Sequence, residues 1–92
     1  MISVKTKLFV HGHVQGVGFR YYAQTMAIQH NIKGWAKNMD NGSVEIVADG
    51  EGKQVASFIE KMKTGSPLAQ VENIEQMDYE SDEALSAFDI RY

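Results

Sequence analysis

The segment Lys5–Arg20, KTKLFVHGHVQGVGFR, contains two different periodicities and sets the start of the fold. In Lys5–Val14 one face carries mostly apolar side chains and the other carries lysines and histidines, as in a strand with one buried face. From Phe19 onward the apolar residues recur at helical spacing. They are Phe19, Tyr22, Ala23, Met26 and Ala27. We therefore expect a strand, a glycine-containing turn and a helix that ends near Asn31.

The middle of the chain predicts a β-hairpin followed by a second helix. Gly34–Asp40 and Ser43–Ala48 are expected to be strands joined at Asn41-Gly42, a pair that favours a two-residue turn with positive φ at both positions. The second helix has its apolar stripe at Val55, Phe58, Ile59 and Met62, and Gly65 and Pro67 stop it.

The last third of the chain predicts two more strands. Val71–Tyr79 alternates imperfectly, because Val71 and Ile74 fall on opposite faces unless a bulge intervenes. Phe88–Tyr92 alternates cleanly and gives a short extra strand. The resulting βαββαβ order predicts an α+β ferredoxin-like sandwich, with two helices on one face of a mostly antiparallel sheet. No repeat or linker is evident, so we expect a single domain over residues 1–92.

The composition excludes several classes of protein. With 43% hydrophobic and 23% charged residues the chain has an ordinary globular composition, and it has no apolar run of about 18 residues that could span a bilayer. Its lack of cysteine excludes disulfides, thiolate metal sites and cysteine nucleophiles, and fits a reducing compartment. No apolar stripe is left unassigned. We therefore expect a cytoplasmic monomer without a membrane partner.

The charge is distributed unevenly along the chain. The net charge of -3 argues against a nucleic-acid partner bound through a broadly basic surface. Residues 1–39 nevertheless hold five basic side chains and no acid, whereas residues 40–92 hold twelve acids and four basic side chains. An acid-free segment is compatible with a site for a small anion, although charge patterning does not by itself establish one.

The turn between the first strand and the first helix is a candidate anion site. Gly16 and Gly18 can adopt backbone angles that let successive N–H groups converge on one point, and the helix that follows adds a partial positive charge. This helix lacks a Ser, Thr, Asp or Asn cap and carries Arg20 in its first turn. A bound anion would compensate for both features. A plain tight turn with a solvated arginine is the alternative on these grounds.

Three stretches of the chain resemble the acylphosphatase family. The first is Gly12–Arg20, GHVQGVGFR. The second is Gly34–Asn38, GWAKN, followed by GSVE at residues 42–45. The third is Gly65–Ala69, GSPLA, followed by Val71-Glu72. The motifs occur in the family's order and cover nearly the whole chain.

The resemblance implies a hydrolase of the ferredoxin-like fold that needs no metal or cofactor. Its substrate would be an acyl phosphate, cleaved to a carboxylate and inorganic phosphate, and phosphate would also act as a competitive inhibitor. Arg20 would bind the phosphoryl group and Asn38 would position the attacking water. The phosphate-binding loop would comprise Val14, Gln15, Gly16, Val17, Gly18, Phe19 and Arg20. The chain departs from the family at His13, where Arg is frequent, and at Asn41, where Asp is common.

This chemistry is consistent with so few residues. A carboxylate leaving group is weakly basic and needs no general acid, so catalysis reduces to positioning and charge stabilisation. Asn38 can orient a water but is too weak a base to deprotonate it, so the proton is expected to go to the phosphate.

Alternative functions use the same residues differently. The domain could bind an anion without turnover, and the presence of Asn38 favours the enzyme over this reading. An RNA-binding module would stack bases on Phe9 and Trp35, but the acidic net charge and the lack of an RNP signature argue against it. His11 and His13 could ligate a metal, but the sequence places no carboxylate beside them.

Overall fold

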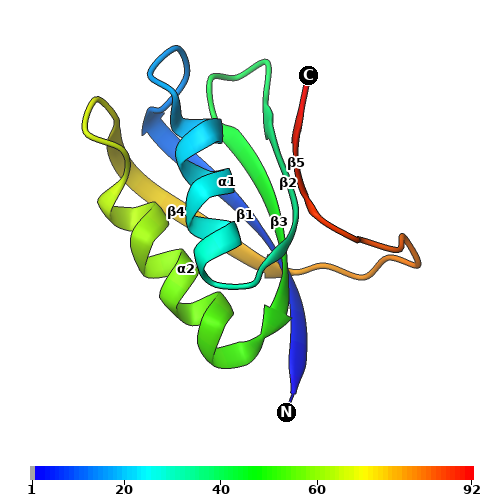
Figure 1. Ribbon diagram of the computed structural model, residues 1–92. Coiled ribbons are helices and arrows are strands. Elements are labelled where there is room, and N and C mark those ends of the chain that lie inside the picture. Colours follow the sequence, from blue (N-terminus) through cyan, green and yellow to red (C-terminus); the bar gives the residue numbers. More distant parts are fainter. Residues whose placement is uncertain (1) are drawn as a thin grey trace.

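The computed structural model describes residues 2–92 and contains a five-stranded sheet in the order β4-β1-β3-β2-β5 (Figure 1). The elements follow one another as β1 (Ser3–His13), α1 (Phe19–Gln29), β2 (Lys33–Asn38), β3 (Val44–Glu51), α2 (Gly52–Thr64), β4 (Gln70–Asp78) and β5 (Phe88–Arg91). Strands β2 and β5 pair in parallel, and the other neighbours pair antiparallel. The predicted ferredoxin-like α+β fold is therefore confirmed, with β5 as the extra strand.

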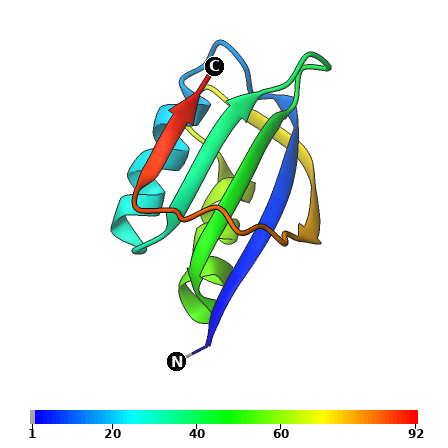
Figure 2. The same cartoon turned by 90° about the vertical axis from the view of Figure 1, so that its right-hand side faces the viewer.

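Both helices pack on one face of the sheet and enclose the core there (Figures 1 and 2). The inward side chains of β1 are Thr6, Leu8 and Val10, all buried, as the alternation predicted. They pack with the apolar stripes of the helices because the periods of strand and helix both direct apolar groups to this layer. The largest fully buried side chains are Phe19 from α1 and Phe58 from α2.

The opposite face of the sheet is crossed by the connection between β4 and β5 (Figure 2). Trp35 lies on this face and is only 6% exposed, with the Arg91 guanidinium 4.6 Å from its ring centroid. Arg91 also pairs with Glu83 of the connection at 2.8 Å. Trp35 is thus a packed residue of this face, not an exposed platform for bases.

The ends of α2 agree with the sequence. The helix has Glu51 at its N-cap, Lys61 and Lys63 in its last turn, and Gly65 at its C-cap with φ 78°. These charges complement the helix dipole. Neither helix among residues 2–92 has the length and apolar character needed to cross a bilayer.

The predicted two-residue turn at Asn41-Gly42 is wrong. The Met39 amide donates to the Ser43 carbonyl at 2.9 Å and the Gly42 amide to the Met39 carbonyl at 3.1 Å, so the loop has three residues, 40–42. Gly42 has φ 92°, whereas Asn41 is not among the positive-φ residues. This is a type I turn followed by a left-handed glycine. The Asn41 side chain stabilises it by accepting from the Ser43 amide at 3.0 Å.

The imperfect alternation of β4 reflects a bulge. The β1–β4 register shifts at His11/Gly12, where His11 pairs with Asn73 but Gly12 pairs with Val71. The extra residue in β4 lets Val71 and Ile74 both pack against the core. The bulge that the sequence required is therefore present.

Candidate active site

Three segments meet at one end of the sheet, because β1, β2 and β5 all run in the same direction. β1 and β2 are both antiparallel to β3, and β5 is parallel to β2. Their carboxyl ends therefore lie at the same end of the sheet. This end carries the loop after β1, the β2–β3 hairpin and the end of β5 (Figures 1 and 2). This topology brings together residues that are far apart in the sequence.

The loop between β1 and α1 presents backbone amides. Gly16 and Gly18 have φ 76° and 75°, as their residue type suggested. Gly18 caps α1 without a side-chain hydrogen bond, no acid lies in the first turn, and the first helical bond runs from the Tyr22 amide to the Gly18 carbonyl at 3.0 Å. Within residues 2–92, the amides of residues 16–21 have no protein acceptor. Such a set of N–H groups at a helix start binds anions.

A pocket of about 140 Å³ opens in front of these amides. Its walls come from the loop, the first turn of α1 and the end of β2. The lining residues are Val14, Gly16, Gly18, Phe19, Arg20, Tyr21 and Asn38. The pocket brings together most of the residues that the sequence singled out, but not Gln15 or Val17. It is smaller than sites for drug-sized ligands, which fits a group the size of phosphate.

Arg20 is held in the pocket from the side of β5. One guanidinium nitrogen, Nη1, donates to the Arg91 carbonyl at 3.0 Å. The guanidinium carbon lies 4.7 Å from the ring centroid of Tyr92. A guanidinium has five N–H donors, so these two contacts orient the group and leave donors for an anion in the pocket.

Asn38 is the last residue of β2 and lines the pocket together with the loop glycines. Its Oδ1 atom is buried and accepts no hydrogen bond from residues 2–92. A buried carbonyl oxygen normally has a donor, so Asn38 lines the pocket with an acceptor that no protein group satisfies.

Gln15 links the two halves of the site, a role that the sequence did not reveal. Its Nε2 donates to the Met39 carbonyl at 2.7 Å and to the Ser43 carbonyl at 2.9 Å. These carbonyls lie at the two ends of the hairpin loop, and Met39 directly follows Asn38. The side chain of Gln15 therefore holds the hairpin against the loop between β1 and α1 instead of lining the pocket. Val17, the other residue outside the lining, packs against the core.

Two tyrosines lie beside Arg20 and were also missed. Tyr21 follows Arg20 in α1, and Tyr92 follows β5. A side-chain hydrogen bond to Tyr92 raises the pKa of the Tyr21 hydroxyl above its ordinary value of 10.0, while the charge of Arg20 lowers it. Tyr21 is therefore a neutral phenol at physiological pH.

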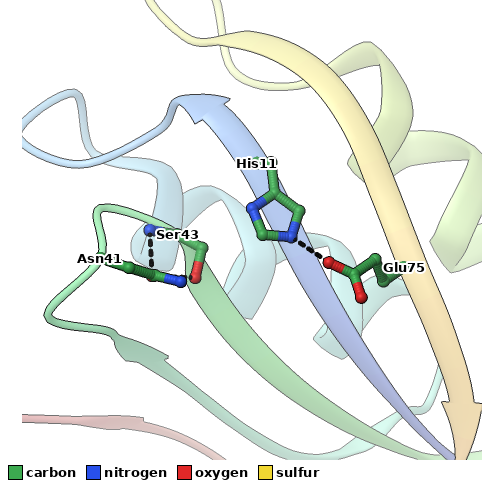
Figure 3. A network of polar contacts seen from close by, with 4 residues as sticks. All are labelled: His11, Asn41, Ser43 and Glu75. Atoms are coloured by element: carbon green, nitrogen blue, oxygen red, sulfur yellow. Dashed lines mark hydrogen bonds and ion pairs between the residues drawn. The ribbon is translucent and has the colours of Figure 1, made fainter.

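The histidines of β1 lie apart from the pocket. His11 Nε2 is 2.6 Å from Glu75 Oε1 of β4 (Figure 3), and His13 is exposed and does not line the pocket. Residues 2–92 contain no group of three or more His, Cys, Asp or Glu side chains arranged to hold a metal ion. Figure 3 also shows the Asn41–Ser43 contacts that shape the hairpin, including a 2.6 Å bond from Ser43 Oγ.

The fold and the pocket define a class: small α+β sandwiches with a glycine-containing strand-to-helix loop beside a small pocket. Comparison with known proteins identifies the family within this class. The acylphosphatase family profile matches residues 6–90. An acylphosphatase of Bacillus subtilis (strain 168) is 43% identical over 86 residues, which are 94% of each chain. One of Oceanobacillus iheyensis is 41% identical over 87 residues, which are 94% of this chain and 96% of the relative.

Solved structures agree with the sequence comparison. The crystal structure of acylphosphatase from Bacillus subtilis has a TM-score of 0.91 and 41% identity, over 99% of this chain and 100% of that one. The chain belongs to the acylphosphatase family, whose members hydrolyse acyl phosphates.

Replacing Gln15 with leucine tests the link between loop and hairpin. We expect Gln15→Leu to lower the free energy of unfolding by about 1–3 kcal/mol, because two hydrogen bonds are lost. Amide exchange in the hairpin, followed by mass spectrometry, should accelerate. The control is Gln29→Leu at the exposed end of α1, which should leave both quantities unchanged. Equal exchange rates in the two variants would contradict the linking role.

Proposed function

We propose that Arg20, the amides of loop residues 14–20 and Asn38 form the whole catalytic apparatus of this acylphosphatase, without a metal or cofactor. The observation that carries the proposal is that Arg20 and Asn38, from different elements, line one small pocket beside unpaired amides. An anion-binding module would need Arg20 and the loop. A hydrolase also needs a group that orients water, and the position of Asn38 in the lining of the pocket supports this additional role.

The loop and Arg20 would bind the phosphoryl group. Phosphoryl transfer passes through a loose transition state with negative charge on the equatorial oxygens, and donors fixed in advance stabilise this charge. Gly16 and Gly18 give the loop its left-handed turns, the loop amides have no protein acceptor, and Arg20 is oriented by β5. A planar guanidinium can donate to two oxygens at once, which an ammonium group cannot match.

Asn38 would orient the attacking water. Its Oδ1 accepts a hydrogen bond from the water, and the water oxygen forms a bond to phosphorus as the bond to the acyl oxygen breaks. The products are a carboxylate and inorganic phosphate, and the water proton goes to a phosphate oxygen because an amide is too weak a base to take it. The leaving carboxylate needs no proton at neutral pH.

The finer points of the proposal concern the surroundings of the enzyme. Inorganic phosphate, as a product with the same charge and shape as the bound group, would compete with the substrate. We further propose one catalytic domain over residues 1–92 that acts as a monomer in the cytoplasm. The lack of cysteine supports a reducing compartment, and the five strands and two helices surround one core.

Metal removal tests the cofactor-free mechanism. We expect the purified protein to hydrolyse benzoyl phosphate at the same rate with and without EDTA, and inorganic phosphate to inhibit competitively. A rate that falls in EDTA and returns with added divalent metal would contradict the mechanism. Binding of phosphate without turnover of any acyl phosphate would replace the enzyme with an anion-binding module.

Substituting Arg20 with lysine tests the phosphoryl-binding role. We expect Arg20→Lys to lower kcat/KM at least about 100-fold, since a bidentate donor to the developing charge is lost, and to weaken inhibition by phosphate. Arg91→Lys is the matched control, because that side chain contacts Glu83 and Trp35 on the other face of the sheet and should leave kcat/KM close to the wild-type value. Normal phosphate affinity in Arg20→Lys would remove Arg20 from the site.

Substituting Asn38 with alanine tests the water-orienting role separately. We expect Asn38→Ala to lower kcat about 100-fold or more while phosphate inhibition persists, because the donors to the phosphoryl group stay in place. Asn73→Ala on the exposed edge strand β4 is the control and should keep kcat. Retained turnover in Asn38→Ala, measured with benzoyl phosphate, would refute the role.

A further inference from the structure

Two exposed tyrosines lie beside Arg20. Tyr21 lines the pocket and is 61% exposed, and Tyr92 is 84% exposed. Tyr21 directly follows Arg20 in α1, and the guanidinium carbon of Arg20 lies 4.7 Å from the centroid of the Tyr92 ring. Two large apolar surfaces therefore stand next to the group that binds the phosphoryl oxygens, although the core does not need them.

The in-line geometry of phosphoryl transfer determines where the acyl group can lie. Attacking water and leaving oxygen occupy opposite sides of phosphorus. With the water on Asn38, the acyl group must extend away from the wall formed by β2. Of the other side chains that line the pocket, Val14 and Phe19 are each 1% exposed and face the core. Arg20 binds the phosphoryl group, so Tyr21 is the remaining side chain that can touch the acyl group.

The chemistry around this position favours an uncharged, flat acyl group. Arg20 is the only cation among the residues that line the pocket, so no second cation is available to bind a charged acyl group. Aromatic rings instead make offset or edge-to-face contacts with another ring.

We propose that Tyr21 and Tyr92 bind the acyl group and make the enzyme selective for acyl phosphates with an aromatic or similarly flat apolar acyl group over those with a small one. This inference rests on the proposed roles of Arg20 and Asn38, because these roles orient the substrate. Tyr21 provides the primary contact and Tyr92 extends the surface.

The test compares two substrates across variants of Tyr21. The ratio of kcat/KM for benzoyl phosphate to that for acetyl phosphate should fall about threefold to tenfold in Tyr21→Ala, the range expected for one lost aromatic pair. Tyr21→Phe keeps the ring and should keep most of the ratio. Ile28→Ala, an exposed apolar side chain at the other end of α1, is the control and should leave both substrates unaffected.

A binding measurement makes the outcome independent of turnover. Benzoylphosphonate and acetylphosphonate lack the bridging oxygen and are not hydrolysed. The wild type should bind benzoylphosphonate more tightly than acetylphosphonate. The ratio of the two affinities should fall in Tyr21→Ala and in Tyr92→Ala. The inhibition constant of phosphate in each variant corrects for any change at Arg20. Ratios equal to wild type in both alanine variants overturn the acyl-binding surface. Failure of the wild type to hydrolyse either substrate instead overturns the proposed catalytic function.

Discussion

The common direction of β1, β2 and β5 is the constraint on which the site depends. Each strand delivers one component to the same edge: β1 the loop amides, β2 Asn38, and β5 the carbonyl and ring that orient Arg20. β1 and β2 each pair antiparallel with β3, which lies between them. They must therefore run in the same direction once the sheet forms. The sheet therefore brings the components together, and the local bonds of Gln15 and Arg20 fix their relative positions.

The start of α1, beside the pocket, lacks the features that usually stabilise the N-terminus of a helix. Helix α1 starts at a left-handed glycine without a side-chain cap and has a cation in its first turn, whereas α2 has basic residues correctly placed in its last turn. Caps and favourable charges at α1 would add about 1 kcal/mol each but would occupy the amides or repel the anion. Departures from local consistency are expected where function requires unpaired groups. Residues 1–39 contain no acidic side chain, so no negative side chain lines the pocket to repel an anion.

Local patterns predicted the elements well and the hairpin loop poorly. Alternation in β1 and the apolar stripes of both helices follow directly from backbone period, so the buried faces could be deduced. The pair Asn41-Gly42 is compatible with a two-residue turn and with the end of a three-residue loop. The structure selects the latter, because the Asn41 side chain accepts from Ser43 and Met39 pairs with Ser43 across the loop. This preference depends on side-chain bonds that turn statistics do not resolve.

Asn38 was implied by the resemblance to acylphosphatases. The sequence by itself determined the order of the elements and the glycine loop that leads to Arg20. These follow from residue type and local spacing, which act over a few residues. Only the tertiary structure decided that Gln15 spans 24 and 28 residues to bond the hairpin, and that Arg20 bonds a carbonyl 71 residues away. Such contacts depend on which strands end at the same end of the sheet. The order and direction of the strands arise from the packing of the whole chain.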